Sequence, residues 1–116
     1  MLVSLMTNQI RTKSNDDTSI LFEIESEPGE GVDVCLEKVS REVSDPSLFP
    51  RALLTTDTLY RVATNDPMCQ AWLFDIPSEK KMIVRTTKGA FQEYSGTPLK
   101  DVVLAAYNAR AFSSQE

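Results

Sequence analysis

The sequence has no histidine, only two cysteines and only four glycines among its 116 residues. Histidine is the usual general base near neutral pH and the commonest ligand of transition metals, so its absence excludes Ser-His-Asp and Cys-His catalysis. Cys35 and Cys69 are far apart in the chain and match no metal-binding or redox motif. We therefore predict no catalytic residues, no metal site and no cofactor, and the composition favours a non-enzymatic protein without deciding the question.

The sequence also has no long apolar run and no phosphate-binding loop. No segment approaches the roughly 20 apolar residues of a membrane span, and Met1–Met6 has neither the length nor the preceding positive charge of a signal peptide. We therefore expect a cytoplasmic protein that does not bind membranes, with both cysteines as small core residues. A disulfide would need an oxidising compartment. Met6 precedes a polar stretch, which leaves open whether translation starts at Met1 or Met6.

Positive charge is scarce as well. Twelve basic and 17 acidic side chains give a formal net charge of −5, which opposes binding to nucleic acids. The charge is uneven, because residues 1–50 carry a net charge of −6 and residues 51–116 a net charge of +1. We expect a protein partner and no nucleic acid, and the sequence leaves homodimerisation open.

The chain length suits one domain, and a hydrophobic content of 41% is sufficient for a packed core. Ile10 is the one large apolar residue in 7–17, which is too little to bury a face. We predict that residues 1–17 are a flexible N-terminal arm and that residues 18–116 form the domain.

Alternating apolar residues predict an antiparallel hairpin of strands at 18–25 and 32–38. Pro28 and Gly29 between them have the positions that a type II turn requires. Residues 32–43 also match a helical period, so strand and helix both remain open for this segment. Similar alternation indicates further strands at 58–63, 69–76, 82–86 and 90–95, with a single-turn connector at 45–50.

The C-terminal region has the clearest helical pattern. Thr97 is a typical N-cap, Pro98 suits the first helical position, and apolar residues follow at helical spacing through Tyr107, with Arg110 next in the same spacing. The predicted fold is therefore α+β. It consists of an antiparallel sheet of about five or six strands with helix 98–110 packed on one face and a flexible arm before it.

Two groups of charged residues are candidates for partner binding. The acidic group on the first hairpin is Glu23, Glu25, Glu27 and Glu30, and the basic group on the 80–89 hairpin is Lys80, Lys81, Arg85 and Lys88. Each group is also what a solvated strand face looks like, and the acidic one would keep a sheet edge unpaired. Neither has the ligand order of a calcium loop or the stacking aromatics of a nucleic-acid site.

Aromatic residues of the central strands offer a second possibility. Trp72 and Phe74 share one face of a strand and could line a ligand pocket between the sheet and the helix, although such residues more often form the core.

The leading hypothesis is a protein-interaction or regulatory domain of the adaptor or assembly-chaperone type. The alternative is a small-ligand-binding domain, or a histidine-free enzyme, with a pocket near Trp72.

Overall fold

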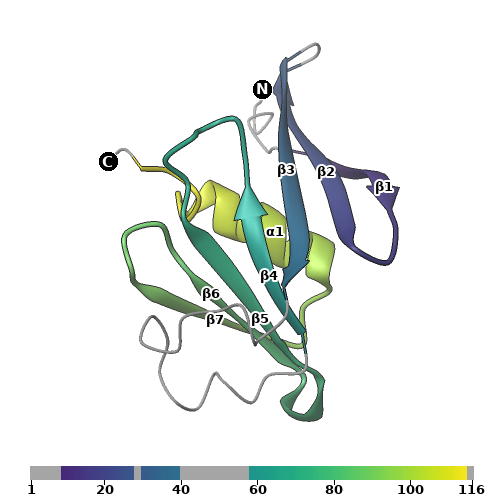
Figure 1. Cartoon of the computed structure of the whole chain (residues 1–116), viewed down its shortest axis with the longest axis vertical. Coiled ribbons are helices and arrows are strands. Elements are labelled where there is room, and N and C mark those ends of the chain that lie inside the picture. The colour runs from purple at the N-terminus through teal and green to yellow at the C-terminus, as the bar shows by residue number, and fades with distance from the viewer. Residues whose placement is uncertain (1–8, 28–29, 40–57, 115–116) are drawn as a thin grey trace, which may run out of the picture.

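The computed structural model describes residues 9–27, 30–39 and 58–114, with the side chains at 26, 27 and 30 excepted. Its described part forms one antiparallel sheet whose seven strands follow chain order, and a helix α1 comes after them (Figure 1). The elements are β1 (Gln9–Asn15), β2 (Ser19–Glu27), β3 (Glu30–Val39), β4 (Thr58–Ala63), β5 (Ala71–Ile76), the 3₁₀ turn η3 (Pro77–Glu79), β6 (Lys81–Arg85), β7 (Phe91–Ser95) and α1 (Leu99–Asn108).

The α+β class and the C-terminal helix are confirmed, whereas the predicted count of five or six strands is wrong. The additional strand is β1, which lies inside the segment assigned to a flexible arm and pairs with β2. Only Ile10 of β1 packs against the core, opposite Ile24. The sequence pattern missed this strand because β1 is an edge strand with one large apolar residue, so it has no apolar alternation.

The strands that sequence alternation predicted are confirmed within one or two residues. β2 and β3 form the predicted hairpin, and β3 continues as a strand to Val39, which decides between strand and helix for 32–39. The turn at Pro28 and Gly29, residues 40–43 and the 45–50 connector lie outside the described residues. Gly89 has a φ of +91° in the β6–β7 reversal, where glycine is favoured.

The two faces of the sheet differ because side chains alternate along each strand. One face, here called the inner face, packs against α1, and Figure 1 shows the curled sheet around this helix. Its buried residues include Phe22, Val34, Val62 and Leu73. The opposite, outer face carries Glu23, Arg61, Trp72 and their cross-strand neighbours.

The apolar stripe of α1 completes the core. Val102, Val103 and Ala106 have no exposed surface, and Leu99 and Tyr107 pack around them. The predicted docking of this stripe on one face of the sheet is therefore confirmed. Because the helix covers the inner face, the outer face has to be stabilised in another way or remain accessible to solvent.

The N-cap prediction is wrong. The N-cap position is occupied by Pro98, and the Thr97 hydroxyl donates a hydrogen bond to the Ser95 carbonyl (3.2 Å) instead of capping the helix. Pro98 has an extended ψ of 150° while its carbonyl accepts the first helical hydrogen bond, from Val102 N–H (3.0 Å), so the helix begins one residue later than predicted.

The helix ends in a Schellman motif at Arg110. Arg110 N–H bonds to the Tyr107 carbonyl (3.0 Å) and Ala111 N–H to the Ala106 carbonyl (2.9 Å), while Arg110 has a φ of +62°. Glycine is usual at this position because a Cβ atom disfavours the left-handed conformation. The arginine therefore holds a backbone conformation that costs on the order of 1 kcal/mol.

Replacing Val103 by Ala should lower the free energy of unfolding by about 1–3 kcal/mol, through lost burial and the cavity that remains. Val103→Asp should destabilise the protein more, because it buries an unpaired charge. Chemical denaturation measures both variants, with exposed Lys100→Ala as the control that should change stability by less than about 0.5 kcal/mol. Unchanged stability of Val103→Asp would contradict the docking of α1.

Arg110→Gly should raise the free energy of unfolding by about 1 kcal/mol, because glycine adopts a φ of +62° without strain. Ala105→Gly, inside α1, is the matched control and should lower stability by about 1 kcal/mol. The same denaturation experiment compares them, and loss of stability in Arg110→Gly would show that the arginine side chain stabilises the fold.

Candidate functional site

The acidic group predicted on the first hairpin is partly neutralised by β1. Glu23 lies on the outer face, where it accepts a hydrogen bond from Arg11 Nε (2.7 Å) and lies 4.0 Å from Lys13 Nζ. Lys13 Nζ also contacts Asp33 (3.3 Å). The Glu23 side chain crosses Gly31, at which a Cβ atom would lie only 2.6 Å from the glutamate oxygen. Exposed ion pairs contribute about 0–1 kcal/mol each, but they compensate the charge.

Of the other acidic candidates, Glu25 shares the outer face of β2 with Glu23 because the two are separated by one residue of the strand. Glu25 lies half-buried opposite Gln9, whereas the side chains of Glu27 and Glu30 are outside the described set. The acidic pattern alone did not indicate this compensation, because β1 was not predicted and its basic residues were therefore not placed beside the acidic strand.

The structure does not join the basic candidates into one cluster. Lys81 on the outer face is paired with Glu79 (3.0 Å) and lies 3.9 Å from Glu93, and the pKa of Lys81 is raised, chiefly by its hydrogen bond to Glu79. Lys80 is exposed in the turn after η3, and Lys88 is exposed at the far end of the same hairpin. Arg85 is half-buried on β6, and its guanidinium reaches the β6–β7 turn, where Nη2 lies 3.6 Å from the place of a Cβ atom on Gly89.

Trp72 and Phe74 lie together on the outer face of β5. They belong to a second apolar cluster, in which Leu59 and Phe74 are buried and Val39, Trp72, Ile76 and Ile83 are partly buried. This face is opposite to α1, so the pair does not lie between the sheet and the helix. Neither of the two described pockets is lined by Trp72 or Phe74.

Cross-strand registry aligns four large side chains on the outer face. Arg61 of β4 is opposite Trp72 of β5, Trp72 is opposite Arg85 of β6, and Arg85 is opposite Phe91 of β7. We call these four residues the arginine–aromatic row. Phe91 is 45% exposed and Arg61 is exposed, so the row is accessible to a partner. Directly opposed residues on one sheet face have Cβ atoms about 4.5–5.5 Å apart, which allows cations and rings to interact.

The row is anchored at one end by an ion pair. Arg61 is also opposite Glu37 of β3, and Arg61 Nε donates to Glu37 Oε1 (3.4 Å). Within the described part of the chain, Arg85 forms no ion pair. Among the described residues Arg85 therefore has no carboxylate partner, and its place in the strand register is between Trp72 and Phe91.

The cysteines are free and half-buried. Cys69 packs against the core, and its thiol donates to the Val62 carbonyl (3.6 Å). Cys35 contradicts the expectation of a core position, because it lies on the outer face between Leu21 and Ala63. Burial, followed by the neighbouring Glu37 carboxylate, raises the pKa of the Cys35 thiol. This environment disfavours the reactive thiolate.

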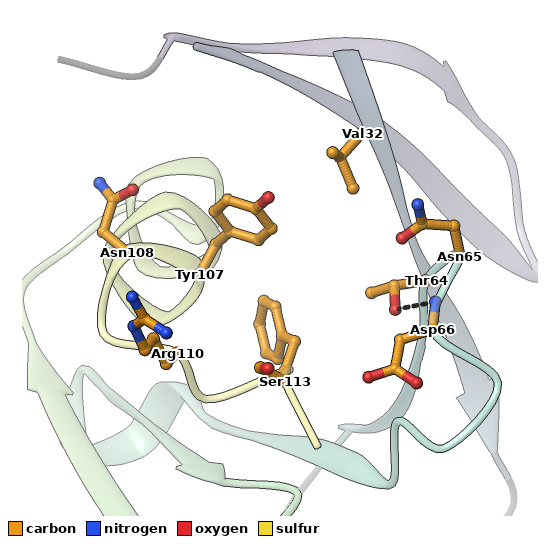
Figure 2. A pocket seen from close by; sticks show the side chains of 9 residues that line it. Val32, Thr64, Asn65, Asp66, Tyr107, Asn108, Arg110 and Ser113 are labelled. Atoms are coloured by element: carbon orange, nitrogen blue, oxygen red, sulfur yellow. Dashed lines mark hydrogen bonds between the residues drawn. The ribbon is translucent and has the colours of Figure 1, made fainter. Parts of the chain in front are cut away.

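A pocket of about 380 Å³ lies where the C-terminal end of α1 faces the β4–β5 loop (Figure 2). We call it the C-terminal pocket. Its wall is formed by Val32, Thr64, Asn65, Asp66, Tyr107, Asn108, Arg110, Phe112 and Ser113. Asn65 and Asp66 lie in the loop after β4, and no sequence pattern predicted this pocket.

Long-range hydrogen bonds hold the wall of the C-terminal pocket in place. Asp66 Oδ2 accepts bonds from Ser114 N–H (3.1 Å) and the Ser114 hydroxyl (2.8 Å), and Oδ1 accepts one from Met68 N–H (2.9 Å). Thr87 N–H bonds to the Ala111 carbonyl (2.8 Å). The segment after α1 is therefore attached to the β4–β5 loop through Asp66 and to the β6–β7 turn through Thr87. No sequence pattern links Asp66 to Ser114, because the two lie 48 residues apart.

The donors around Asp66 stabilise its charged form. The backbone bond from Met68 is the largest cause of its lowered pKa, and the Ser114 bonds add to it. Among the described residues, no three potential metal-ligating side chains form a group, and no helix is long and apolar enough to cross a membrane.

The lowered pKa of Asp66 predicts a pH-dependent contribution to folding. Since the folded pKa lies below the ordinary value of 3.8, the ionised carboxylate stabilises the fold above that pH, and this stabilisation is lost as the pH falls through the folded pKa. Asp66→Asn should therefore be less stable than the parent at neutral pH, and the difference should shrink in acid. Denaturation at a series of pH values measures this, and a difference that is constant with pH would contradict it.

Comparisons with known proteins provide no relative. No family model matches the chain, and no curated protein and no solved structure is significantly similar to it.

Proposed function

We propose that the chain is a non-enzymatic protein-interaction domain whose docking surface is the arginine–aromatic row. The observation that carries this proposal is the alternation of Arg61, Trp72, Arg85 and Phe91 across four adjacent strands of the accessible face. Tryptophan, arginine and other aromatic residues are enriched at interfaces and dominate their binding energy.

The arrangement suits binding because neighbouring strands hold the side chains in register. A guanidinium beside an aromatic ring is attracted to its π face, which limits the rotamers of both groups before a partner arrives. The buried pair Leu59 and Phe74 lies in the next cross-strand row of the same face and packs in one apolar cluster with Trp72. A pre-ordered surface loses less entropy on binding than a flexible one.

Charge favours an acidic partner at this surface. Arg85 forms no ion pair with a described residue, and residues 51–116 carry a net charge of +1 within a chain of net charge −5. A carboxylate can pair with Arg85 while an apolar side chain packs against Trp72 or Phe91 beside it. We therefore assign the row to short acidic peptide segments with an aromatic or proline anchor.

This assignment moves the interaction site away from the acidic group of the first hairpin. Glu23 is already paired with Arg11 and Lys13, so a basic partner would have to displace existing contacts. The alternative of a ligand pocket or active site at Trp72 stays a prediction, and the described pockets lend it no support.

A peptide-display selection with the immobilised protein tests the proposal. Recovered peptides should combine acidic residues with an aromatic or proline residue, and their binding should change the fluorescence of Trp72, the single tryptophan. Arg85→Glu and Phe91→Ala should each weaken binding by about tenfold or more.

Lys100→Glu is the matched control, because it makes the same charge change on the exposed side of α1. It should leave peptide binding nearly unchanged. Peptides without acidic residues, or equal weakening by both charge reversals, would refute the proposal. A concentration-dependent dimer that Phe91→Ala dissociates would instead make the row a self-interface.

A further inference from the structure

The C-terminal pocket is separate from the arginine–aromatic row. Val32 belongs to the inner face of β3, and the other lining residues come from the loop after β4 and from the end of α1 onward. The volume of about 380 Å³ is at the lower end of the range for small-molecule sites, roughly 300–1,000 Å³. The pocket therefore suits a small ligand.

The loop wall of this pocket is rich in oxygen acceptors. Thr64, Asn65 and Asp66 follow one another after β4, and Figure 2 shows all three on the same side of the pocket. Each of these side chains carries an oxygen that can accept a hydrogen bond. The Thr64 hydroxyl oxygen accepts one bond from Asp66 N–H (3.1 Å), which leaves one of its two lone pairs. This wall therefore suits a ligand group with several donors.

Asp66 adds a negative charge to the loop wall. Its Oδ2 atom accepts two bonds from Ser114, whereas Oδ1 accepts one from Met68 N–H (2.9 Å), so one lone pair of Oδ1 is left beside these contacts. All three donors are neutral groups, and none of the described lysines or arginines forms an ion pair with Asp66. A cationic N–H group is the donor that gains most from this carboxylate.

The arginine of the pocket does not neutralise this charge. Arg110 is exposed, and Figure 2 shows its guanidinium on the helix side, beside Asn108 and turned away from Asp66. Water and salt screen an exposed charge, so Arg110 opposes a cation at Asp66 only weakly. A ligand cation can therefore occupy the loop side of the pocket without a contact to Arg110.

Tyr107 and Val32 supply apolar surface to the same pocket. Both residues are half-buried, and Figure 2 shows Tyr107 directed toward Val32 across the pocket. An alkyl chain that covers these side chains is removed from water, which favours binding in proportion to the apolar area buried. The pocket thus combines an acidic, acceptor-rich wall with an apolar part.

We propose that the C-terminal pocket binds a small primary alkylamine in its protonated form, with the ammonium group at Asp66 and the alkyl chain against Tyr107 and Val32. A primary ammonium group has three N–H donors, which suits a wall with several acceptors. The alkyl chain is flexible, so the ligand needs no fixed spacing between the carboxylate and the apolar surface. The net charge of −5 also favours the approach of a cation over that of an anion.

Titration of the ¹⁵N-labelled protein with ethylammonium and butylammonium chloride up to about 10 mM, at constant ionic strength, tests this, because amide shifts detect millimolar binding. Butylammonium should shift the amides of Asn65, Asp66 and Tyr107. It should bind more tightly than ethylammonium, by up to about fourfold for each added methylene group. The neutral alcohol 1-butanol should bind at least about tenfold more weakly, because it lacks the charge.

Asp66→Asn should reduce butylammonium binding by about tenfold or more, because the amide keeps the size of the side chain and loses its charge. Asp101→Asn is the matched control, since it removes the same charge from the exposed first turn of α1 and should leave binding unchanged. Because Asp66→Asn is expected to be less stable, both changes are also made in the Arg110→Gly protein, whose expected extra stability keeps the fold. Arg110→Gly alone should bind butylammonium at least as tightly as the parent.

Absence of amide shifts with butylammonium would overturn the proposal, as would equal binding of butylammonium and 1-butanol or of the two amines. Equal weakening by Asp66→Asn and Asp101→Asn would also overturn it, because the amine would then be attracted by overall charge alone. Arg85→Glu, on the outer face, should leave amine binding unchanged while it weakens peptide binding. The two results are independent, so failure of one site does not imply failure of the other.

Discussion

The rest of the structure depends on the packing of three α1 residues, Val102, Val103 and Ala106, against the inner face of the sheet. None of the three has exposed surface, and buried residues of β2 to β6 surround them. Because seven strands contribute to one curled sheet, a single ten-residue helix is enough to close its inner side. Burial of this apolar stripe therefore determines which face of the sheet is covered by the helix and which side chains lie on the opposite, outer face. It also determines where the last turn of α1 lies.

Both proposed sites follow from that packing. The helix covers one face, so the alternation of each central strand places Arg61, Trp72 and Arg85 on the other. The helix ends at Asn108, and the Schellman motif directs Ala111 and Phe112 back into the core. The turn that makes this possible leaves Arg110 beside the C-terminal pocket.

Strand pairing determines which of the charged groups seen in the sequence are neutralised by ion pairs. The acidic residues of the first hairpin form the most prominent charged group in the sequence, yet Arg11 and Lys13 of β1 lie against Glu23 and Asp33. Arg85, by contrast, is one of several basic residues in its part of the sequence, and only the strand register places it between two aromatic residues, Trp72 and Phe91. Uncompensated charge is therefore a property of strand register more than of local composition.

Local periodicity was sufficient for most of the elements, because alternation and helical spacing directly report which side chains are buried. The predicted ends of β2 to β7 and of α1 each lie within two residues of the observed ends. β1 was missed because Ile10 is its only apolar contact with the core, and the Thr97 cap was wrong because Pro98 takes that position. Of the candidate site residues, Trp72 and Arg85 reappear in the proposed surface, but in a row that no local pattern could indicate.

The sequence by itself determined the α+β class, the hairpins, the amphipathic helix and the unequal charge of the two halves, since all of these depend on neighbours within a few residues. The tertiary structure alone decided the pairing of β1, the cross-strand row and the bond from Ser114 to Asp66, 48 residues apart. These features depend on contacts between distant segments, and the free energy of such contacts is set by the whole packed core.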